Sequence, residues 1–428
     1  MSPKIIISFI FVVLVSTSMF FKKEKPFIKV SEVSNNCGIK THMLRVKSDN
    51  VIYVKCKFKN AGVLHNSPEK HGISAVIAEL LCRKINGLSP QETREKLLEL
   101  GVINLFIRAF EDHFVLSFYV LKDKVSDALK FLSPIFSRPE FSKNDLEFIK
   151  EKYPIILDTD ASHPQELLFD KLMGILYQNH NYGLNNTGTA RAISSITEHD
   201  VRDFIKSNFS KDKLEVFFTG DLSSSETETY IEILFSKLAG KNQEASSNAT
   251  IASSGLSEEK SALIHKKNME NIAGVMSGIR LDKLNDREKA ALYIIVETLF
   301  NEKTGDFCLG LRSHNMAYEV NCAILRRSYS SVFYFFVYID KGDLINYKKY
   351  LKDKISAYQN KLNINDLKRT QNHLVAQTKD GFADITDIDE KIKFNSLPFS
   401  EVTEAIFAGV AKKLFDESQM RTVCICSD

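Results

Sequence analysis

Histidines and carboxylates that lie close together in the chain are the first residues to consider for catalysis or metal binding. One such set is His65, Glu69 and His71, in which two histidines flank a glutamate. Two histidines one helical turn apart can hold zinc, with a glutamate acting on the bound water. Pro68 and the Asn, Ser and Gly residues around it predict a loop here instead of a helix. We therefore interpret the set as a surface loop.

No other short motif predicts an active site. The sequence contains no H-E-x-x-H zinc motif, no G-x-S-x-G nucleophile turn, no Walker phosphate loop and no G-x-G-x-x-G nucleotide motif. His180 stands alone in a turn rich in Tyr, Asn and Gly, and His113 follows a predicted turn at Glu111 and Asp112. We interpret both histidines as isolated residues.

The seven cysteines form no recognisable metal or redox motif, because no C-x-x-C occurs. They are Cys37, Cys56, Cys82, Cys308, Cys322, Cys424 and Cys426. An odd number leaves at least one thiol unpaired in an exported protein. Cys424 and Cys426 lie two apart on a predicted strand, so they share a face and do not pair with each other. Small buried hydrophobic residues are the favoured interpretation of the set.

Length and composition predict a folded protein with two or more domains. At 428 residues the chain is too long for one compact core. Hydrophobic residues make up 44% and charged residues 26%, which is typical of globular proteins. The formal net charge is +3, and no basic stripe is interleaved with aromatic residues, so the sequence argues against binding of nucleic acid.

The N-terminus has the features of an export signal. Lys4 precedes an almost wholly apolar run from Ile5 to Phe21, and Ser16 and Ser18 place small residues near its end. The run is about 17 residues long, at the short limit for spanning a bilayer. We predict that residues 1–21 are a cleaved signal for export to the periplasm. An uncleaved anchor in the inner membrane is the alternative, and a buried helix is disfavoured because no amphipathic pattern marks a core face.

A flexible linker divides the rest of the chain into two halves. Residues 241–259 are rich in Ser, Ala and Asn and show no apolar period. The first half then covers residues 27–240, and the second half covers residues 260–428.

The two halves repeat one order of predicted elements: a helix, two extended runs, two further helices and a closing apolar strand. In the first half these are Gly72–Lys84, Ile103–Ala109, His113–Val120, Lys124–Phe136, Ser142–Ile156 and Leu214–Gly220. Their counterparts in the second half are Arg287–Phe300, Ala317–Leu325, Ser331–Ile339, Asp343–Lys361, Asn363–Lys379 and Met420–Asp428. The matching order indicates an internal duplication.

Each half also opens with predicted strands. Gly38–Lys47 and Asn50–Lys57 alternate like a hairpin joined at Ser48 and Asp49, and His265–Ile279 takes that place in the second half. Opening strands followed by helices and an antiparallel hairpin indicate an α+β fold. We expect two homologous halves, each a mainly antiparallel sheet with helices packed on one face.

Three segments resemble the insulinase/pitrilysin metallopeptidase family. Asn66–Leu81 is similar to the first helix of that family. His180–Phe204 resembles the segment before the strand that closes its first half. Leu309–Val320 is similar to a stretch of the second half that carries an Arg and a Tyr. The order and spacing of these segments agree with the family over nearly the whole chain after residues 1–21.

The resemblance implies that the zinc site of the family is missing here. Active members carry His-x-x-Glu-His on the first helix, where both ligands and the base project from one face. With Gly72 to Ser74 as the anchor, these positions fall on Ala75, Ala78 and Glu79. Alanine can neither bind a metal ion nor accept a proton, and Glu79 alone cannot hold zinc, which needs about three protein ligands.

The third ligand of the family is a Glu on a later helix. Counting back from Pro164 places this position near Ile156. Asp158 and Asp160 lie close by and are interpreted as solvated carboxylates at a helix end. We therefore expect no metal in this chain and a zinc ion in a partner subunit.

The resemblance also implies a possible substrate-binding pair, Arg312 and Tyr318. In the family an Arg and a Tyr reach substrate opposite the zinc, and in two-chain members they can lie on the subunit without zinc. Arginine can donate to a peptide carbonyl or carboxylate, and tyrosine can donate to an oxyanion. The family separates the pair by seven positions, whereas this sequence separates it by six. An exposed helix arginine and a tyrosine in a strand core are the alternative.

Two functions are compatible with these features. In the first, the chain is the non-catalytic, substrate-binding subunit of a two-chain zinc metalloendopeptidase, similar to mitochondrial processing peptidase. A zinc-bearing homologous subunit then completes a heterodimer that acts on unfolded or extended peptides, which can add to sheet edges. In the second, the chain is a structural or peptide-binding pseudoenzyme with no role in proteolysis. An active protease with unorthodox ligands is a third and weaker interpretation.

Overall fold

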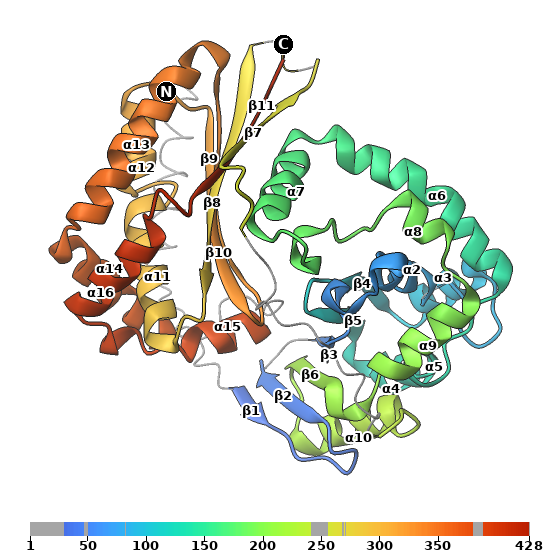
Figure 1. The fold of residues 1–428 in the computed structure, drawn as a ribbon. Helices are drawn as coiled ribbons and strands as arrows, with labels where there is room; N and C mark the ends of the chain where they lie inside the picture. Colours follow the sequence, from blue (N-terminus) through green and yellow to red (C-terminus); the bar gives the residue numbers. More distant parts are fainter. Residues whose placement is uncertain are drawn as a thin grey trace, which may run out of the picture.

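The computed structural model describes residues 30–46, 50–81, 83–240, 256–267, 269, 271–379 and 388–427. The predicted export signal at residues 1–21 lies outside the described residues, as does most of the predicted linker. The described chain forms two mixed sheets with helices, which confirms the expected α+β fold (Figure 1). In this part of the chain no helix combines the length and the apolarity needed to cross a membrane.

The first sheet has six strands in the order β1-β2-β6-β3-β5-β4. They are β1 (Val30–Glu32), β2 (Lys40–Arg45), β3 (Val51–Lys59), β4 (Val102–Ala109), β5 (His113–Leu121) and β6 (Leu214–Gly220). β6 runs parallel to β2, and the other pairs are antiparallel. Every residue of β6 is buried, because the strand lies inside the sheet and both of its faces are covered.

The second sheet has five strands in the order β7-β11-β8-β10-β9. They are β7 (Ser261–His265), β8 (Ile272–Asp282), β9 (Glu319–Arg326), β10 (Ser330–Asp340) and β11 (Arg421–Cys426). β11 runs parallel to β7 and antiparallel to β8. The second sheet therefore has the same topology as the first sheet without β1: in both, the last strand of the half lies between the first two.

The predicted hairpin of Gly38–Lys47 with Asn50–Lys57 is wrong. β2 and β3 are not neighbours, because β6 lies between them: Phe218 pairs with Met43 on one side and with Val54 on the other. In the second half β11 separates β7 from β8 in the same way. A hairpin pattern uses only residues that are close in sequence, so it cannot reveal a strand that inserts from the far end of the half.

Helices cover one face of each sheet. Those of the first half are α2 (Ile73–Leu80), α3 (Pro90–Glu99), α4 (Val125–Leu132), α5 (Pro134–Ser137), α6 (Lys143–Ser162), α7 (Pro164–Leu176), α8 (Ala190–Ser194), α9 (Glu198–Asn208) and α10 (Ser224–Phe235). Those of the second half are α11 (Asp286–Phe300), α12 (Asp306–Ser313), α13 (Leu344–Asn360), α14 (Ile364–Lys379), α15 (Ile388–Asn395) and α16 (Glu404–Leu414).

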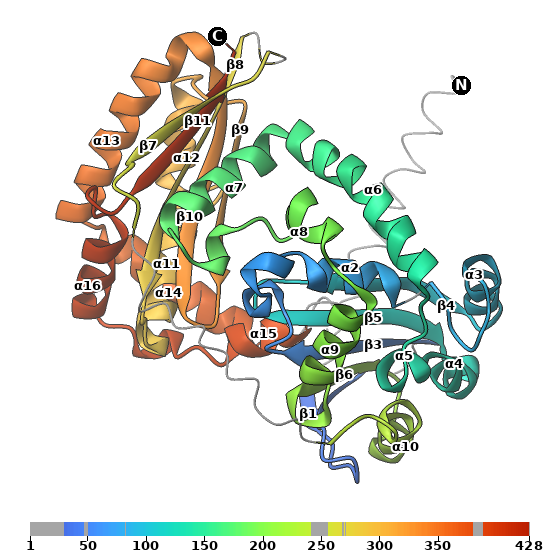
Figure 2. The same ribbon diagram turned by 45° about the vertical axis from the view of Figure 1, so that its right-hand side comes forward.

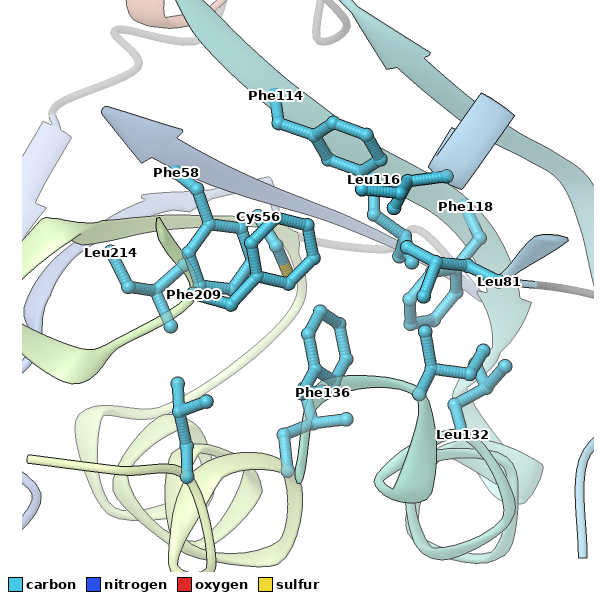
Figure 3. Close-up of a cluster of buried hydrophobic side chains, with 14 of the residues drawn as sticks. Cys56, Phe58, Leu81, Phe114, Leu116, Phe118, Leu132, Phe136, Phe209 and Leu214 are labelled. Atoms are coloured by element: carbon cyan, nitrogen blue, oxygen red, sulfur yellow. The ribbon is translucent and has the colours of Figure 1, made fainter. Parts of the chain in front are cut away.

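Alternation along β3 separates a hydrophobic core from a polar face. Val54, Cys56 and Phe58 point into the first core, where the ring of Phe58 stacks on Phe209 with centroids 4.4 Å apart (Figure 3). Lys55, between Val54 and Cys56, therefore points to the opposite face of the sheet. This opposite face, which the helices of the first half do not cover, is called the inner face below.

One helix of each half packs on the sheet of the other half. It lies on the face that this sheet's own helices do not cover, which is called the inner face in both halves. α7 of the first half packs against β8 and β11 of the second sheet (Figure 2). It buries Leu168 and Leu172 in a cluster with residues of the second sheet that include Phe336. α15 crosses in the opposite direction, and its Ile388 is buried against Leu44 and Phe217 of the first sheet.

Two glycines of β8 let α7 approach the second sheet closely. A Cβ atom on Gly274 would lie 3.1 Å from Cδ1 of Leu168 and 2.9 Å from Cγ2 of Ile425. A Cβ atom on Gly278 would lie 3.0 Å from Cδ2 of Leu172. The missing side chains thus leave two hollows that the leucines of α7 fill.

The two halves also meet at the tips of their hairpins. Arg327, in the turn between β9 and β10, contacts Glu111 in the turn between β4 and β5 at 3.2 Å. Its side chain is 4% exposed, and its guanidinium lies over the rings of Tyr177 and Tyr182. Next to it, the amide of Ser328 donates to Asp112. The joint therefore places a buried cation against two aromatic rings and Glu111, with Asp112 bound to the neighbouring backbone.

Candidate functional site

The helix that corresponds to the zinc helix of the resembled family starts at a tight backbone crossing. Gly72 precedes α2 with φ +98°, a conformation that favours glycine. A Cβ atom on Gly72 would lie 2.8 Å from the carbonyl oxygen of Thr187 and 3.0 Å from Cα of Gly188. The N-terminus of α2 is thus fixed against the loop before α8.

Ala75, Ala78 and Glu79 lie on one face of α2, as their spacing predicts. The two alanine methyl groups are partly buried and pack against the first hydrophobic core, whereas Glu79 is exposed. Zinc in proteins is held by about three nitrogen, sulfur or oxygen ligands. The face offers one carboxylate, so its residues do not fit a zinc ion.

The other candidate ligands lie partly outside the described residues. The side chains of Ile156, Asp158 and Asp160 lie outside the part of the chain that the structure describes. Over the described ranges, no group of three or more His, Cys, Asp or Glu residues is placed to hold a metal ion. The six described cysteines are free thiols.

The interpretation of His65, Glu69 and His71 as a surface loop is wrong for His71. Glu69 is exposed, but His71 is 3% exposed and its Nε2 atom lies 2.7 Å from the carbonyl oxygen of Asn185. Burial lowers the pKa of His71. The histidine therefore ties the start of α2 to the loop after α7 and serves the fold.

Arg312 and Tyr318 both lie at the surface of the second half. Arg312 is in the last turn of α12, with Glu302 at 3.5 Å. Tyr318 directly precedes β9, and its hydroxyl donates to Asp340 at 2.8 Å. Because Tyr318 is 68% exposed, the alternative of a tyrosine in a strand core is wrong.

A cavity of about 560 Å³ lies between the two halves. β3, β4 and β5 line one side, and α11, β9 and α15 line the other. Its aromatic residues are Tyr53, Phe106, Phe110, His113, Tyr119 and Tyr293, and its charged residues are Lys55, Glu111, Arg326, Asp389 and Glu390. Such a mixture of apolar surface and a few charged groups is typical of a ligand-binding cleft.

Arg312 and Tyr318 do not line this cavity. Arg326, which does, stands at the other end of β9 from Tyr318. Eight residues of strand separate the two positions by about 26 Å. The structure therefore does not bring the predicted pair and the cavity together.

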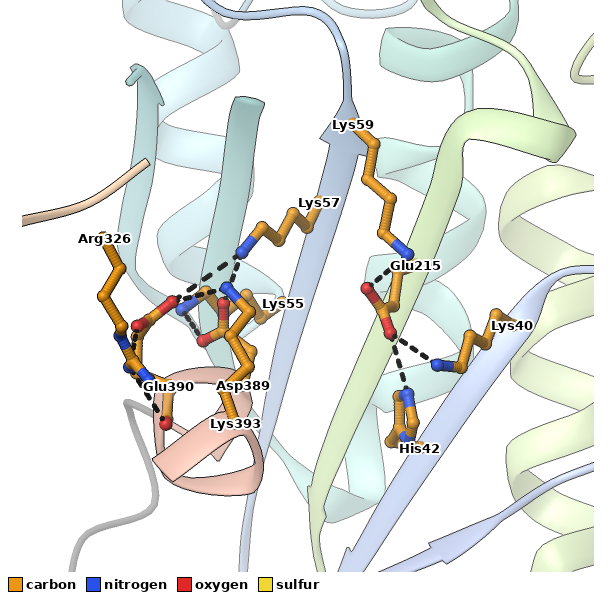
Figure 4. A network of polar contacts seen from close by, with 10 residues as sticks. All are labelled: Lys40, His42, Lys55, Lys57, Lys59, Glu215, Arg326, Asp389, Glu390 and Lys393. Atoms are coloured by element: carbon orange, nitrogen blue, oxygen red, sulfur yellow. Dashed lines mark hydrogen bonds and ion pairs between the residues drawn. The ribbon is translucent and has the colours of Figure 1, made fainter. Parts of the chain in front are cut away.

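Ion pairs between the two halves form one wall of the cavity (Figure 4). The carboxylate of Asp389 on α15 lies 2.5 Å from Nζ of Lys55 and 2.8 Å from Nζ of Lys57. Burial alone would raise the pKa of Asp389, but the charges of the two lysines outweigh it and hold the pKa well below its usual range. Glu390 contacts Arg326 at 2.5 Å and Lys393 at 2.8 Å.

A second charged group lies on the same inner face (Figure 4). Glu215 of β6 contacts Nε2 of His42 at 2.9 Å, Lys59 at 2.9 Å and Lys40 at 3.3 Å. These contacts hold the pKa of Glu215 below its usual range against the effect of burial. The inner face of the first sheet is thus rich in cations.

This inner face was not predicted from the sequence, although β3 carries a signal for it. Lys55 and Lys57 alternate with buried apolar residues, and such a pattern is usually assigned to solvent. Both lysines are nevertheless buried, at 9% and 4% exposure. Their burial is explained by the contact of both lysines with Asp389 of α15, which lies more than 300 residues later in the chain.

His113 in the cavity wall predicts a loss of stability in mild acid. Burial and the nearby charges of Lys57 and Lys393 lower its pKa to about 3, although Asp389 and Glu390 act in the opposite direction. An unfolded histidine titrates near 6.5, so between these values the unfolded chain binds more protons. The free energy of unfolding should therefore fall by roughly 3–5 kcal/mol as the pH drops from 6.5 towards 3.

Urea unfolding of the His113→Gln variant between pH 4 and pH 7 measures this contribution. The variant should show a flatter pH dependence than the unchanged chain. The control is His199→Gln, because the side chain of His199 is 83% exposed and forms a surface pair with Asp203. An equally steep profile for His113→Gln would contradict the assignment.

Comparison with known proteins relates the chain to one peptidase family. Residues 195–374 match the family described as "Peptidase M16 inactive domain". Mitochondrial-processing peptidase subunit beta of Dictyostelium discoideum is 23% identical over 205 residues, which cover 47% of this chain and 42% of that protein. An uncharacterized zinc protease of Rickettsia felis is 22% identical over 219 residues, covering 50% and 51%. The aligned part of the chain spans about half the length of these curated relatives or less.

Solved structures share the fold over nearly the whole chain. The peptidase M16 inactive domain from Pseudomonas fluorescens has a TM-score of 0.80 and 19% identity, with 94% of this chain and 98% of that chain covered. A protease from Helicobacter pylori has a TM-score of 0.77 and 16% identity, with 93% and 99% covered. The periplasmic protease PqqL from Escherichia coli has a TM-score of 0.75 and 11% identity, with 95% and 48% covered.

These likenesses agree with the family resemblance read from Asn66–Leu81, His180–Phe204 and Leu309–Val320. The resemblance rested on three segments, whereas the structural similarity covers the fold of both halves. The chain is therefore similar to peptidases of the M16 family, and its residues 195–374 match the peptidase M16 inactive domain.

Proposed function

We propose that this chain is the non-catalytic, substrate-binding subunit of a two-chain zinc metalloendopeptidase. The observation that carries the proposal is the face of α2. The family resemblance implies that Ala75 and Ala78 stand in the places of a ligand and of the general base, and their methyl groups are packed against the core. A chain with this face needs its zinc ion and its proton acceptor from another subunit.

A homologous zinc-bearing chain is the proposed partner. The curated relatives include proteins named as subunits of mitochondrial-processing peptidase, and a structural relative is named as periplasmic. Residues 1–21 carry the pattern of an export signal. We therefore place the proposed heterodimer in the periplasm, with unfolded or extended peptides as its substrates.

The proposed contribution of Arg312 and Tyr318 is to hold substrate. The side chain of Arg312 is 43% exposed, and its guanidinium has a carboxylate partner at the long distance of 3.5 Å, so it can reorient towards a peptide. The exposed hydroxyl of Tyr318 donates to Asp340, and a substrate oxygen would have to replace that acceptor. Both groups are suited to bind peptide oxygens.

The test is to purify the chain with a zinc-bearing homologue and to assay the complex on an unstructured peptide. Arg312→Ala should lower kcat/KM by about tenfold to a hundredfold, because a hydrogen bond to a charged group contributes about 1.5–3 kcal/mol. The control is Arg369→Ala, because the side chain of Arg369 is 82% exposed and pairs with Asp366 on its own helix. Unchanged kcat/KM for Arg312→Ala would remove this residue from the substrate site.

A peptide-binding pseudoenzyme with no role in proteolysis is the second candidate. The cavity between the halves favours it, because this chain alone supplies every wall. Isothermal titration with an unstructured peptide separates the two. Binding to the isolated chain with no turnover in any complex supports the pseudoenzyme, whereas turnover that requires both subunits supports the heterodimer.

A further inference from the structure

The two helices that cross between the halves are held in different ways. α7 buries five apolar side chains in its cluster on the second sheet: Leu168, Leu172, Met173, Ile175 and Leu176. α15 places one fully buried apolar side chain, Ile388, in a small cluster on the first sheet. Burial of one such side chain contributes about 1.5–3 kcal/mol, so the apolar attachment of α15 is several-fold weaker.

Ile392 of α15 adds a partly buried side chain to this cluster, and the other attachment of α15 to the first sheet is electrostatic. Asp389 is 4% exposed and contacts both Lys55 and Lys57. The attraction within a buried ion pair is largely offset by the cost of removing the charges from water. These contacts therefore select an anionic partner strongly while adding little net free energy to the docking of α15.

Removal of α15 from the first sheet would leave a cationic surface beside the cavity. Lys55 already lines the cavity, and Lys57 follows it on the same face of β3. A carboxylate from another molecule would satisfy them as Asp389 does.

We propose that α15 is a releasable clasp and that its position on the first sheet is a binding site for an acidic peptide segment. The segment carries an apolar side chain next to a carboxylate, which are the two features that Ile388 and Asp389 present. The cavity provides the approach to Lys55, and binding replaces α15 at the first sheet. This inference goes beyond the proposed function and holds whether or not the chain serves a zinc-bearing partner.

The first experiment uses the unchanged full chain. The probe, called the acidic peptide, is a synthetic peptide with the sequence of residues 388–395 in which Gln replaces Lys391 and Lys393, and the matched peptide also has Asn in place of Asp389. Hydrogen exchange followed by mass spectrometry should show faster exchange of the α15 amides when the acidic peptide is present. Equal exchange with and without the peptide, or equal effects of the two peptides, would overturn the proposal.

The second experiment weakens the clasp from within the chain. Asp389→Asn removes the charge and keeps the shape, so the acidic peptide should bind at least about tenfold more tightly than to the unchanged chain. The control is Glu404→Gln, because Glu404 pairs with Lys368 inside the second half. A folded Asp389→Asn variant with unchanged peptide affinity would show that α15 is a fixed part of the structure, and the first experiment decides the question if this variant does not fold.

Discussion

Replacement of Leu172 by alanine is expected to destabilise the contact between α7 and the second sheet by about 2–5 kcal/mol. The side chain is fully buried in the cluster between the halves and fills the hollow above Gly278. Truncation removes buried apolar surface and leaves a cavity that the rigid strand β8 cannot close. The urea midpoint followed by far-ultraviolet circular dichroism measures the loss.

Gly278→Val tests the same contact from the opposite side. A Cβ atom at this position would already lie 3.0 Å from Leu172 and 3.1 Å from the carbonyl oxygen of Phe333. Two further methyl groups must therefore push α7 away from the sheet, at a cost of about 1–3 kcal/mol or more. Leu98→Ala is the control, because Leu98 is 65% exposed, and it should change stability by less than about 0.5 kcal/mol. Equal effects of Leu172→Ala and the control would exclude α7 as a main attachment.

Arg327→Ala is expected to weaken the joint at the hairpin tips by about 3–5 kcal/mol. The change removes a buried cation and leaves Glu111 without the cation that it contacts there. It also removes the donor to the carbonyl oxygen of Tyr182 and the group that lies over two tyrosine rings. Arg327→Lys should recover part of the loss, because an ammonium group keeps the charge but lacks the planar fork.

A titration provides an independent measurement at this joint. Burial, Arg327 and Arg280 together lower the pKa of His180. Removal of the Arg327 charge should therefore raise the pKa of His180, which proton NMR of the histidine ring can follow. Arg369→Ala should leave both the pKa of His180 and the stability nearly unchanged, since Arg369 is an exposed residue of α14. An unshifted His180 in Arg327→Ala would contradict the proximity of the two groups.

Local elements of the fold were predictable from sequence because their patterns are local. The predicted strand Leu214–Gly220 is β6, and His113–Val120 differs from β5 by one residue. Alternation and apolar runs specify such strands without reference to other parts of the chain. The predicted helix Arg287–Phe300 likewise differs from α11 only by Asp286 at its start, where Asn285 caps the helix.

The pairing of strands and the exchange of helices were not predictable in this way. The position of β6 between β2 and β3 depends on residues that are distant in sequence. The docking of α15 on the first sheet depends on the contact of Asp389 with Lys55 and Lys57. The sequence around either partner contains no pattern that predicts this contact. Long-range contacts of this kind leave only weak local traces, such as two lysines on a strand that proves to be buried.

In the candidate site, too, the features set by local sequence were predictable and those set by distant residues were not. Ala75, Ala78 and Glu79 share a helix face in the structure because helical spacing alone places them there. The cavity between the halves was missed, since its walls come from both halves and from the crossing helix α15. The roles assigned to Arg312 and Tyr318 stay predictions, with Tyr318 exposed instead of buried in a strand core.

The insertion of β6 and β11 sets an order of assembly. Each is the last strand of its half in the chain, and each lies between two strands that precede it. The first sheet stays split until β6 is available, and the second until β11 is. Closing such long loops is slow relative to local pairing. During synthesis the second sheet would therefore remain open, with its apolar strands unprotected, until residues 421–426 emerge, and chaperones that shield exposed strands would act at this stage.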